Sequence, residues 1–588
     1  MQLCDSRRLT GRNLIQDRPG AVIEVQLAAA EADEVIAGWR HQARRILDAV
    51  GWEGEEVRLR RHRSGATLAL SAPIDALYSA TEVNEWALEA ATAAVGGRPG
   101  PDLAAGAARL REAIQRESQP ALLELRDAAA AHGVAFLADD DLVTLGLGCG
   151  SRTWPRRTLL APGEVDWPAL HDVPTVLVTG TNGKTTTVRL VAAMLAAAGR
   201  VAGMTTTDGI AVGDELLESG DYSGPAGARQ LLRDRRVEAA VLETARGGIL
   251  RRGIAIAGAA GAAVTNVAAD HLGELGIDDL ADLAETKLVV IGALAPGGRA
   301  VLNASDPELA RRGAALAARG TAVTWFSLRP PLGSAKAAPF PDLDWHLRRG
   351  GEAVLLDGDR LVLARGGRRE AIAGLDEVPI AFGGAARYNV ANALAAIGLG
   401  AALGLPAAAM AAGLRSVQRD ARDNPGRGAL FVLRGRRILV DYAHNPHGLR
   451  ALLELATSLP AARRLLLIGQ AGDRSDEAIR DLARTAWSWR AERVIVKELP
   501  TMLRGRLPGE VPALLAGELR RLGAPAESIG HAPSELDAVR QALVWAQPGD
   551  LLLLLVHTQR AEVLELLSTA GAALEVRTAA QRGDDQAQ

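Results

Sequence analysis

Hydrophobic and polar residues recur along the chain with two periods, one typical of strands and the other of helices. From residue 173 onward, short apolar runs are separated by longer amphipathic stretches. This pattern predicts strands at 175–179, 238–242, 262–267, 299–303 and 322–327, and helices at 184–198 and 280–294. Such alternation indicates a parallel sheet that is covered by helices on both faces. A hairpin with a tight Asp-Gly turn is predicted at 353–364.

The regions on either side of this series have patterns of their own. Residues 1–98 predict strands at 21–27, 57–61 and 66–70 and helices at 32–50 and 81–95. The segment 96–106 is rich in glycine and proline and is predicted to be a linker, and 119–137 a helix followed by a short strand. After 425–428 a second α/β series predicts strands at 429–433, 437–442, 464–468, 493–497 and 550–556, and helices at 476–490 and 508–522.

The predicted fold class is therefore α/β, with three domains. These are an amino-terminal α+β domain (1–165), a central P-loop ATPase domain with a parallel sheet (166–424) and a carboxyl-terminal Rossmann-like α/β domain (425–588). A chain of 588 residues is long enough for several domains of ordinary size.

Composition and charge narrow the class of protein. Hydrophobic residues make up 48% of the chain and charged residues 23%, which excludes wholesale disorder. The net charge is only −3, so the basic surface of a nucleic-acid-binding protein is not expected. The two cysteines, Cys4 and Cys149, are too few for a disulfide framework, and no apolar run is long enough to span a membrane. We expect a cytoplasmic protein with neither nucleic acid nor a membrane as a partner, and leave a homo-oligomer open.

The segment VLVTGTNGKTTT (176–187) has the pattern of a nucleotide phosphate site. Gly180 and Gly183 let the backbone curl after a buried strand, so that backbone N–H groups and a helix N-terminus face an anion. In such loops the lysine, here Lys184, reaches the β- and γ-phosphates, and the hydroxyl, here Thr185, binds Mg²⁺. The strict P-loop spacing is not met, because a valine stands where the first glycine belongs. The alternative is a glycine-rich turn without a ligand.

Three further residues are predicted to lie at the same edge of the sheet. Glu243 ends a buried strand, where open α/β sheets bind their ligands, and a carboxylate there suits Mg²⁺ beside Thr185. His271 follows the next strand in NVAADHLG (266–273), and Lys287 lies in the helix after it. Taken alone, a solvated glutamate and a structural histidine explain Glu243 and His271 as well.

Several motifs, in one order, resemble those of the Mur ligase family of ATP-dependent amide ligases. They are TGTNGKTT (179–186), the strand end at Glu243, NVAADHLG with the downstream lysine, LNASDP (302–307), YNVANALAA (388–396), PGR (425–427) and DYAHNP (441–446). The resemblance implies that ATP activates a carboxylate as an acyl phosphate, which an amine then attacks. It also implies Mg²⁺ as a cofactor.

The resemblance assigns roles to single residues. ATP binding is expected from Gly180, Thr181, Asn182, Gly183, Lys184, Thr185, Thr186, Asn303, Arg427 and Asp441. Metal binding is expected from Thr185, Glu243, His271 and, if it is carbamoylated, Lys287; Lys184, Glu243, His271 and Lys287 form the expected catalytic set. His444 and Asn445 are expected to shape a closed interface that contacts substrate. For each residue of the last domain taken singly, the alternative is a role in a loop or hinge.

A closer resemblance, over residues 170–575, is to the Mur-like carboxyl-terminal half of cyanophycin synthetases. It rests on GMTTTDGI (203–210), VLETARGGILRRG (241–253), GDRSDEAIRDLAR (472–484) and VKELPTMLRGRLPGEVPALL (496–515). Residues 1–165 resemble the amino-terminal domain of those enzymes more weakly. Between Gly150 and Val173 there is no room for their ATP-grasp domain. One ligase centre is therefore expected where those enzymes have an aspartate-adding and an arginine-adding centre.

This resemblance also implies substrates. They are a small-molecule carboxylate and an amino acid, arginine first, or a cyanophycin-like polymer. Arg246 is the expected contact of the acid, and Asp473 and Asp476, with Glu477 beside them, are expected to neutralise a guanidinium. The alternatives are a structural arginine and a solvated helix start capped by Ser475. For the whole protein, the alternative is a catalytically reduced scaffold that binds a polymer or another synthetase.

Overall fold

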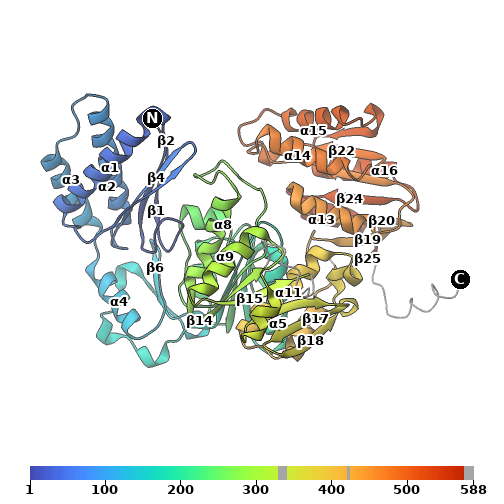
Figure 1. Ribbon diagram of the computed structural model, residues 1–588, viewed down its shortest axis with the longest axis horizontal. Coiled ribbons are helices and arrows are strands. Elements are labelled where there is room, and N and C mark those ends of the chain that lie inside the picture. Colours follow the sequence, from blue (N-terminus) through green and yellow to red (C-terminus); the bar gives the residue numbers. More distant parts are fainter. Residues whose placement is uncertain (329–340, 420–423, 572, 575–588) are drawn as a thin grey trace. The chain divides into compact units, whose positions relative to one another are not determined.

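The computed structural model describes residues 1–328, 341–419, 424–571 and 573–574, and Figure 1 shows its ribbon. The chain divides into two compact units. Unit 1 consists of residues 1–357, 362–372 and 393–413, and unit 2 of the remaining described residues. The three predicted domains, with boundaries at 165 and 424, stay a prediction.

The amino-terminal part of unit 1 is an antiparallel sheet packed against helices. Its elements are β1 (Gln2–Leu9), β2 (Gly20–Gln26), α1 (Ala29–Val50), β3 (Val57–His62), β4 (Gly65–Ser71), α2 (Leu77–Val95) and α3 (Leu103–Glu117). The strand order is β1-β2-β4-β3. Trp39 of α1 is fully buried, and its ring N–H donates to the side chain of Asn84 in α2 at 2.9 Å. The α+β architecture predicted here is confirmed.

The predicted linker at 96–106 is wrong over its last residues, because α3 begins at Leu103. The side chain of Asp102 caps this helix by accepting a hydrogen bond from a backbone N–H three residues on, at 2.8 Å. Gly106 lies against the ring of Trp86, where an added Cβ would be 2.3 Å from the indole nitrogen. This glycine therefore allows a close approach of α2 and α3 instead of forming a flexible link.

A small sheet and a large sheet complete unit 1. The small one, with strand order β5-β6-β7, follows a helix and consists of α4 (Pro120–Ala131), β5 (Phe136–Ala138), β6 (Leu142–Leu145) and β7 (Arg152–Pro155). The elements of the large one and its connections are β8 (Thr175–Thr179), α5 (Lys184–Ala197), β9 (Ala202–Thr205), β10 (Gly209–Val212), β11 (Glu215–Ser219), α6 (Pro225–Leu232), β12 (Ala239–Glu243), α7 (Arg246–Arg251), β13 (Ala259–Val264), α8 (Leu280–Leu288), β14 (Leu294–Asn303), α9 (Pro307–Ala318), β15 (Ala322–Ser327), α10 (Leu343–Arg348), β16 (Glu352–Asp357), β17 (Arg360–Arg365) and β18 (Arg368–Gly374).

The strand order of the large sheet is β11-β10-β9-β12-β8-β13-β14-β15-β16-β17-β18. In this order, neighbouring strands between β9 and β16 pair in parallel, whereas β10 pairs antiparallel with β9 and β11. After β8 the chain adds strands on one side of β8, and it then crosses to the other side at β13. The carboxyl end of β8 is thus the point where the strand order reverses, which is where open α/β sheets bind ligands.

Unit 2 contains a second, mostly parallel sheet. Two helices precede it in the sequence, α11 (Arg387–Ala402) and α12 (Ala407–Ser416), and most of each helix belongs to unit 1. Its own elements are β19 (Ala429–Leu433), β20 (Arg436–Asp441), α13 (Pro446–Thr457), β21 (Arg464–Ile468), α14 (Asp476–Trp487), β22 (Arg493–Lys497), α15 (Glu510–Arg521), β23 (Ile529–Ala532), α16 (Glu535–Trp545), β24 (Leu551–Leu555), α17 (Arg560–Thr569) and β25 (Ala573–Leu574). The strand order is β23-β22-β21-β24-β20-β19-β25.

The predicted α/β fold class is confirmed, and β8, β15, β19, β21 and β22 match their predicted bounds to the residue. Several predictions were too long, among them the helix predicted at 476–490, which ends at Trp487, and two predictions in unit 1. The helix predicted at 280–294 ends at Leu288, where a 3₁₀ turn (Val289–Ala293) takes over. The strand predicted at 262–267 ends at Val264, because the next two residues bind the phosphate loop. No helix among the described residues is both long and apolar enough to cross a bilayer.

Candidate active site

The loop between β8 and α5 has the geometry of a phosphate-binding loop. Gly180 has a φ of 147° and Gly183 a φ of 88°, which are values that side chains disfavour. A Cβ on Gly180 would be 1.8 Å from Thr265 Oγ1. Thr265 Oγ1 donates to Asn182 O at 2.6 Å, and Asn266 Oδ1 accepts from Asn182 N at 3.0 Å. The end of β13 therefore fixes this loop directly in front of the N-terminus of α5.

A hydroxyl and a carboxylate meet beside this loop. Thr185 Oγ1 donates to Glu243 Oε2 at 2.7 Å, and both residues are almost completely buried. A second hydroxyl, that of Thr207, lies 3.3 Å from Thr185 Oγ1 and was not anticipated from the sequence. Thr186, the next residue of α5, is also buried. Oxygen donors of this kind are the ligands that Mg²⁺ prefers, so the donor set fits this ion.

The two lysines of the predicted catalytic set influence each other. Lys184 Nζ donates to Thr181 O at 3.1 Å within the loop. Lys287, in the last turn of α8, is only 3% exposed. Burial, and then the positive charge of Lys184, lowers the pKa of Lys287 from 10.5 to about 7. Near neutral pH, a large fraction of Lys287 therefore carries an uncharged, nucleophilic amine.

His271 lies in a loop that Arg246 holds in place. His271 has a φ of 54°, which is uncommon for a residue with a side chain, and its Nδ1 lies 3.0 Å from Glu274 Oε1. Arg246, the first residue of α7, donates to the His271 carbonyl and pairs with Glu274 Oε2 at 2.9 Å. This is the structural role that the sequence left open for Arg246, and its contact with an acid substrate stays a prediction. The spacing His-x-x-Glu was the available signal for Glu274.

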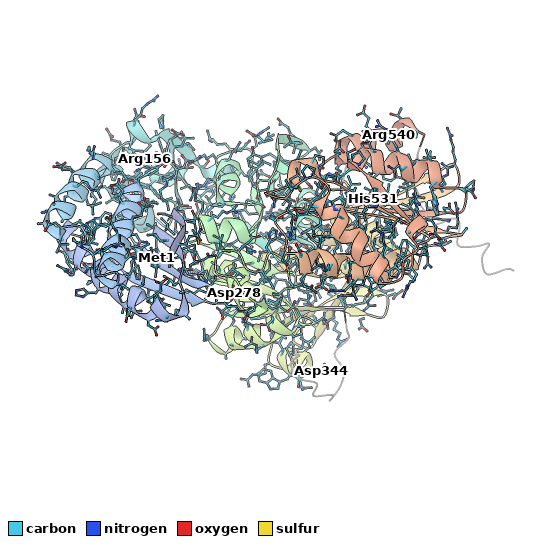
Figure 2. The ribbon with its side chains drawn as sticks, turned by 90° about the horizontal axis from the view of Figure 1, so that it is seen from above. Met1, Arg156, Asp278, Asp344, His531 and Arg540 are labelled. Atoms are coloured by element: carbon cyan, nitrogen blue, oxygen red, sulfur yellow. The ribbon has the colours of Figure 1, made fainter. Side chains whose placement is uncertain are left out.

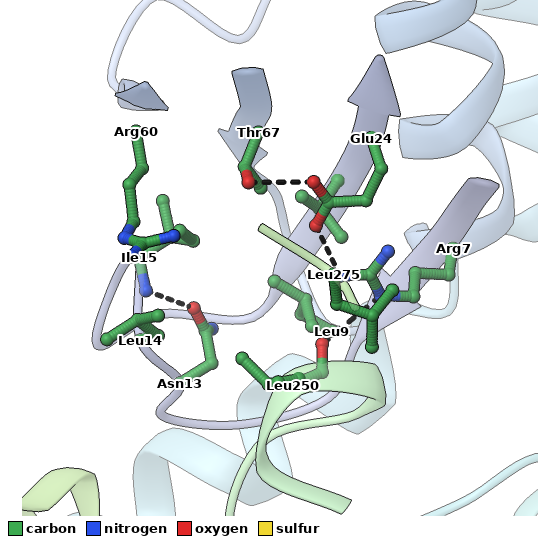
Figure 3. A pocket seen from close by; sticks show the side chains of 11 residues that line it. Arg7, Leu9, Asn13, Leu14, Ile15, Glu24, Arg60, Thr67, Leu250 and Leu275 are labelled. Atoms are coloured by element: carbon green, nitrogen blue, oxygen red, sulfur yellow. Dashed lines mark hydrogen bonds and ion pairs between the residues drawn. The ribbon is translucent and has the colours of Figure 1, made fainter. Parts of the chain in front are cut away.

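The amino-terminal strands fix the other end of α7. Arg7 Nε donates to Leu250 O at 3.1 Å, and a guanidinium at the carbonyl end of a helix is favourable. Arg7 also pairs with Glu24 of β2 at 2.9 Å, and Thr67 of β4 donates to Glu24 at 2.7 Å. These side chains surround a small cavity between β1, β2, β4 and α7, seen in Figure 3.

The hairpin of β3 and β4 also contacts the segment after His271. Arg60 donates to the carbonyl of Gly276 and pairs with Asp282. The backbone N–H of Arg63 donates to Asp278 Oδ2 at 2.6 Å, and Figure 2 labels this aspartate. The amino-terminal sheet therefore supports both α7 and the segment that carries His271.

Asn303 closes the same edge of the large sheet. Its Nδ2 donates to Thr265 O at 2.9 Å, and its Oδ1 accepts from Ser305 N at 2.9 Å. It thus ties β14 to the residue that also supports the phosphate loop. Its predicted contact with adenine is not tested by these bonds.

In unit 2, Asp441 ends β20 in a buried position. Burial raises the pKa of its carboxyl from 3.8 to about 6, although Ala443 N donates to Oδ1 at 2.8 Å. Burial, and then the charge of Asp441, raises the pKa of the Tyr388 hydroxyl well above 10. The guanidinium of Arg427 lies 5.0 Å from the ring centre of Tyr442, a cation–π distance. Tyr388 was missed as a neighbour of Asp441, although it begins the motif YNVANALAA.

His444 and Asn445 lie in the turn after Asp441. Asn445 Oδ1 accepts from Gly448 N at 2.9 Å and so caps α13. The carbonyl of His444 accepts from Gln470 Nε2 at 2.9 Å. These bonds give both residues a local structural role, and their contact with substrate stays a prediction.

The acids proposed for a guanidinium substrate already contact arginines of the chain. Asp473 pairs with Arg504, and Asp476 pairs with Arg506 at 2.8 Å. Ser475 Oγ accepts from a backbone N–H of α14, as in the capped helix start that the sequence left open as an alternative. A substrate guanidinium would have to displace these arginines, so this assignment also stays a prediction.

A buried charged cluster at the carboxyl edge of the second sheet was missed from the sequence. Lys497, at the end of β22, pairs with Glu535, and neither side chain is exposed. Glu535 also accepts from the backbone N–H groups of His557 at 2.6 Å and of Thr558 at 2.7 Å. His557 Nε2 lies 3.2 Å from Ala443 O. This cluster therefore contacts the turn that follows Asp441.

Comparisons with known proteins agree with these motifs. Residues 178–400 match the model of the Mur ligase middle domain, and residues 426–555 match that of the Mur ligase, glutamate ligase domain. The cyanophycin synthetase of Trichormus variabilis is 38% identical over 65% of this chain and 41% of its own length. That of Geminocystis herdmanii is 36% identical over 69% of this chain and 45% of its own length. The chain therefore spans less than half the length of these relatives.

The comparisons also give more distant similarities. The UDP-N-acetylmuramoyl-L-alanyl-D-glutamate–2,6-diaminopimelate ligase of Gloeobacter violaceus is 28% identical over 67% of this chain and 74% of its own length. Among solved structures, E. coli FolC in complex with DHPP and ADP gives a TM-score of 0.49 at 20% identity, over 68% of this chain and 88% of that one. The two family models together cover more than half of the 588 residues, and the chain belongs to the Mur ligase family.

Proposed function

We propose that this protein is an ATP-dependent ligase that joins a carboxylate to an amine and releases ADP. The observation that carries the proposal is the buried pair of Thr185 and Glu243 beside the glycine loop. It offers oxygen ligands for Mg²⁺ at the place where a helix N-terminus binds phosphates. When bound there, the ion neutralises charge on the β- and γ-phosphates.

The residues of unit 1 can be given roles in such a reaction. A carboxylate oxygen attacks the γ-phosphorus as the bond to ADP breaks, and the amine then displaces phosphate from the acyl phosphate. Two anions must approach each other in the first step, so positive charge and in-line positioning dominate catalysis. Lys184 supplies positive charge to the phosphates. Arg246 orients the loop of His271 and, in this proposal, contacts the acid.

Lys287 is proposed to carry a carbamate. A buried amine whose pKa is about 7 reacts readily with CO₂, and the product would replace a buried cation near Lys184 by an anion able to bind metal. We expect a carbamate signal in the ¹³C NMR spectrum of protein equilibrated with ¹³C-bicarbonate. The signal should be missing in Lys287→Met, and its absence from the wild type would remove the carbamate from the proposal without affecting the ligase assignment.

For the substrates, we propose that the amine is arginine and that the acid is a small carboxylate or a cyanophycin-like polymer. The support for this assignment is the 38% identity to a cyanophycin synthetase, together with two acids in the first turn of α14, Asp476 and Glu477, and Asp473 just before it. We expect the reaction to take place in the cytoplasm. Because Asp473 and Asp476 already pair with arginines, exchange of these partners on substrate binding is part of the assignment.

One experiment tests the ligase and its amine together. ADP release and amide formation, the latter by mass spectrometry, are measured across the amino acids with candidate acids and β-aspartyl compounds. We expect product with arginine, and loss of product in Lys184→Ala but not in Arg236→Ala, a surface control. Product formed with a neutral or acidic amino acid instead would contradict arginine as the amine and leave the ligase assignment in place. Substantial product from Lys184→Ala would contradict the proposed active site, and ADP release without any product would favour a nucleotide-binding scaffold.

A further inference from the structure

Arginines gather in unit 1 where α6 and α7 face the end of β1 and the turn between β5 and β6. Two acids of that turn, Asp139 and Asp140, lie among them, and each already has a partner. Asp139 pairs with Arg233 at 2.6 Å. Asp140 pairs with Arg8 at 2.8 Å and accepts from the Tyr78 hydroxyl at 2.9 Å. The acids of this region are thus used by two of its arginines.

Arg229 of α6 is a third arginine of this group, and it has no acidic partner within the described residues. It is only 8% exposed. Its Nη1 donates to Thr10 Oγ1 at a long 3.4 Å, and its buried Nε has no hydrogen-bond partner there. Burial lowers the pKa of this guanidinium below its usual 12.5; the charges of Arg233 and Arg252 act in the same direction, and those of Asp139 and Asp140 oppose them. An unpaired buried charge is strongly unfavourable, which calls for a compensating group.

Arg252, directly after α7, completes the group. Its Nη1 donates to the carbonyls of Arg8 at 3.3 Å and Arg251 at 3.2 Å, and no carboxylate pairs with it in the described part of the chain. The carbonyl of Arg252 accepts both from Thr10 N at 2.8 Å and from Thr10 Oγ1 at 3.1 Å. Thr10 is therefore the residue that links Arg229 to Arg252.

We propose that Arg229 and Arg252, which Thr10 links, form a binding site for an oxyanion, a carboxylate or phosphate group, separate from the phosphate loop. Guanidinium groups donate paired hydrogen bonds to both kinds of oxyanion, and a bound anion would give Arg229 the direct partner that Asp139 and Asp140, paired with other arginines, do not provide. The six-residue helix α7 connects this site to Arg246, about 9 Å away along the helix axis. An anion bound here therefore contacts the helix that also holds the loop of His271.

Titration calorimetry on the full chain tests the site. The probes are inorganic phosphate and succinate, each against chloride at matched ionic strength, and they distinguish a phosphate from a carboxylate ligand. The test variant is Arg229→Met. The matched control is Arg312→Met, which removes another largely buried arginine of unit 1, one that has an acidic partner in Glu308. Phosphate bound at the phosphate loop contributes equally to both variants, so the difference between them reports on the new site.

We expect Arg229→Met to raise the dissociation constant of at least one probe by roughly ten- to a hundredfold, as for the loss of a charge-assisted hydrogen bond, and Arg312→Met to leave it unchanged. Without anion, Arg229→Met should melt no lower than the wild type, because it removes a buried charge that has no ion-pair partner in the described residues. If it does not fold, Arg252→Met, at an exposed position, should raise the constant in the same way. Equal affinities in the test and control variants, or no binding beyond that of chloride, would overturn the proposal.

Discussion

At the scale of single residues, Gly180 is the position on which the phosphate loop depends most. Its φ is 147°, and a Cβ added to it would lie 1.8 Å from Thr265 Oγ1, so there is no room for a side chain. Strain of this kind costs about 1–3 kcal/mol or displaces the loop. We expect Gly180→Ala to weaken ATP binding by roughly tenfold or more, measured with a fluorescent ATP analogue. Gly163→Ala, where nothing lies within 4 Å, is the control, and equal affinities in the two variants would contradict the assigned loop geometry.

Lys287 makes the stability of unit 1 depend on pH. Its pKa is about 7 in the folded protein against 10.5 for an unperturbed lysine, so between these values the unfolded chain binds the extra proton. Stability therefore rises with pH across this window, by at most about 1.4 kcal/mol per pH unit. Lys287→Met lacks this contribution. The free energy of unfolding of the wild type minus that of the variant should increase from pH 7 to pH 9 in bicarbonate-free urea titrations, and a constant difference would refute the shifted pKa.

Residues inside a contiguous motif could be predicted from the sequence, whereas their partners could not. Gly180, Lys184 and Thr185 share one short segment, whose spacing reports the loop directly. The hydroxyl of Thr265 matters because β13 lies beside β8, more than eighty residues away in sequence. Glu274 is close to His271 in sequence, but its pairing with Arg246 depends on where α7 lies in the fold.

At the scale of elements, Arg7 of β1 holds α7 through its hydrogen bond to the Leu250 carbonyl, and a buried ion pair with Glu24 of β2 fixes Arg7 itself. Arg7→Met would leave the Glu24 carboxylate buried without its guanidinium, which costs about 3–5 kcal/mol. We expect unit 1 to lose stability of that order in denaturant titrations. Arg236→Ala removes an exposed arginine that has two acidic partners, Asp234 and Glu215, and should cost no more than about 1 kcal/mol. Similar losses in the two variants would show that burial does not decide the strength of these pairs.

Element bounds followed from the sequence where hydrophobic periodicity alone sets them. The central strands β8, β21 and β22 are buried along nearly their whole length, so the apolar run and the strand coincide. The bounds of β13 and α3 differ from prediction because other contacts decide them. Asn266 continues the strand pattern but turns toward the phosphate loop, and Gly106 belongs to a helix because Trp86 covers it.

At the scale of the whole molecule, the chain passes between its two units more often than a linear division suggests. Residues 358–361 and 373–392 belong to unit 2, although they precede segments of unit 1. Composition shifts and glycine-rich stretches mark boundaries only where the chain leaves a domain once. They could indicate a change near 425–428, but not a return to unit 1 at 393–413.

Two compact units predict two unfolding transitions in calorimetry, as is common for chains with more than one domain. Arg7→Met identifies the transition of unit 1, because its buried partner lies in that unit and only that transition should move down.

Mg²⁺ and ADP should then raise the same transition more than the other, since the phosphate loop and the Thr185–Glu243 pair both belong to unit 1. A ligand at about a hundred times its dissociation constant stabilises by about 2.7 kcal/mol, enough for a shift of several degrees. Lys184→Ala should reduce this shift while leaving the transition of unit 2 in place. A single transition that Arg7→Met and ADP move as a whole would show that the units unfold together, and a larger ADP shift in the transition insensitive to Arg7→Met would place the main nucleotide contacts in unit 2.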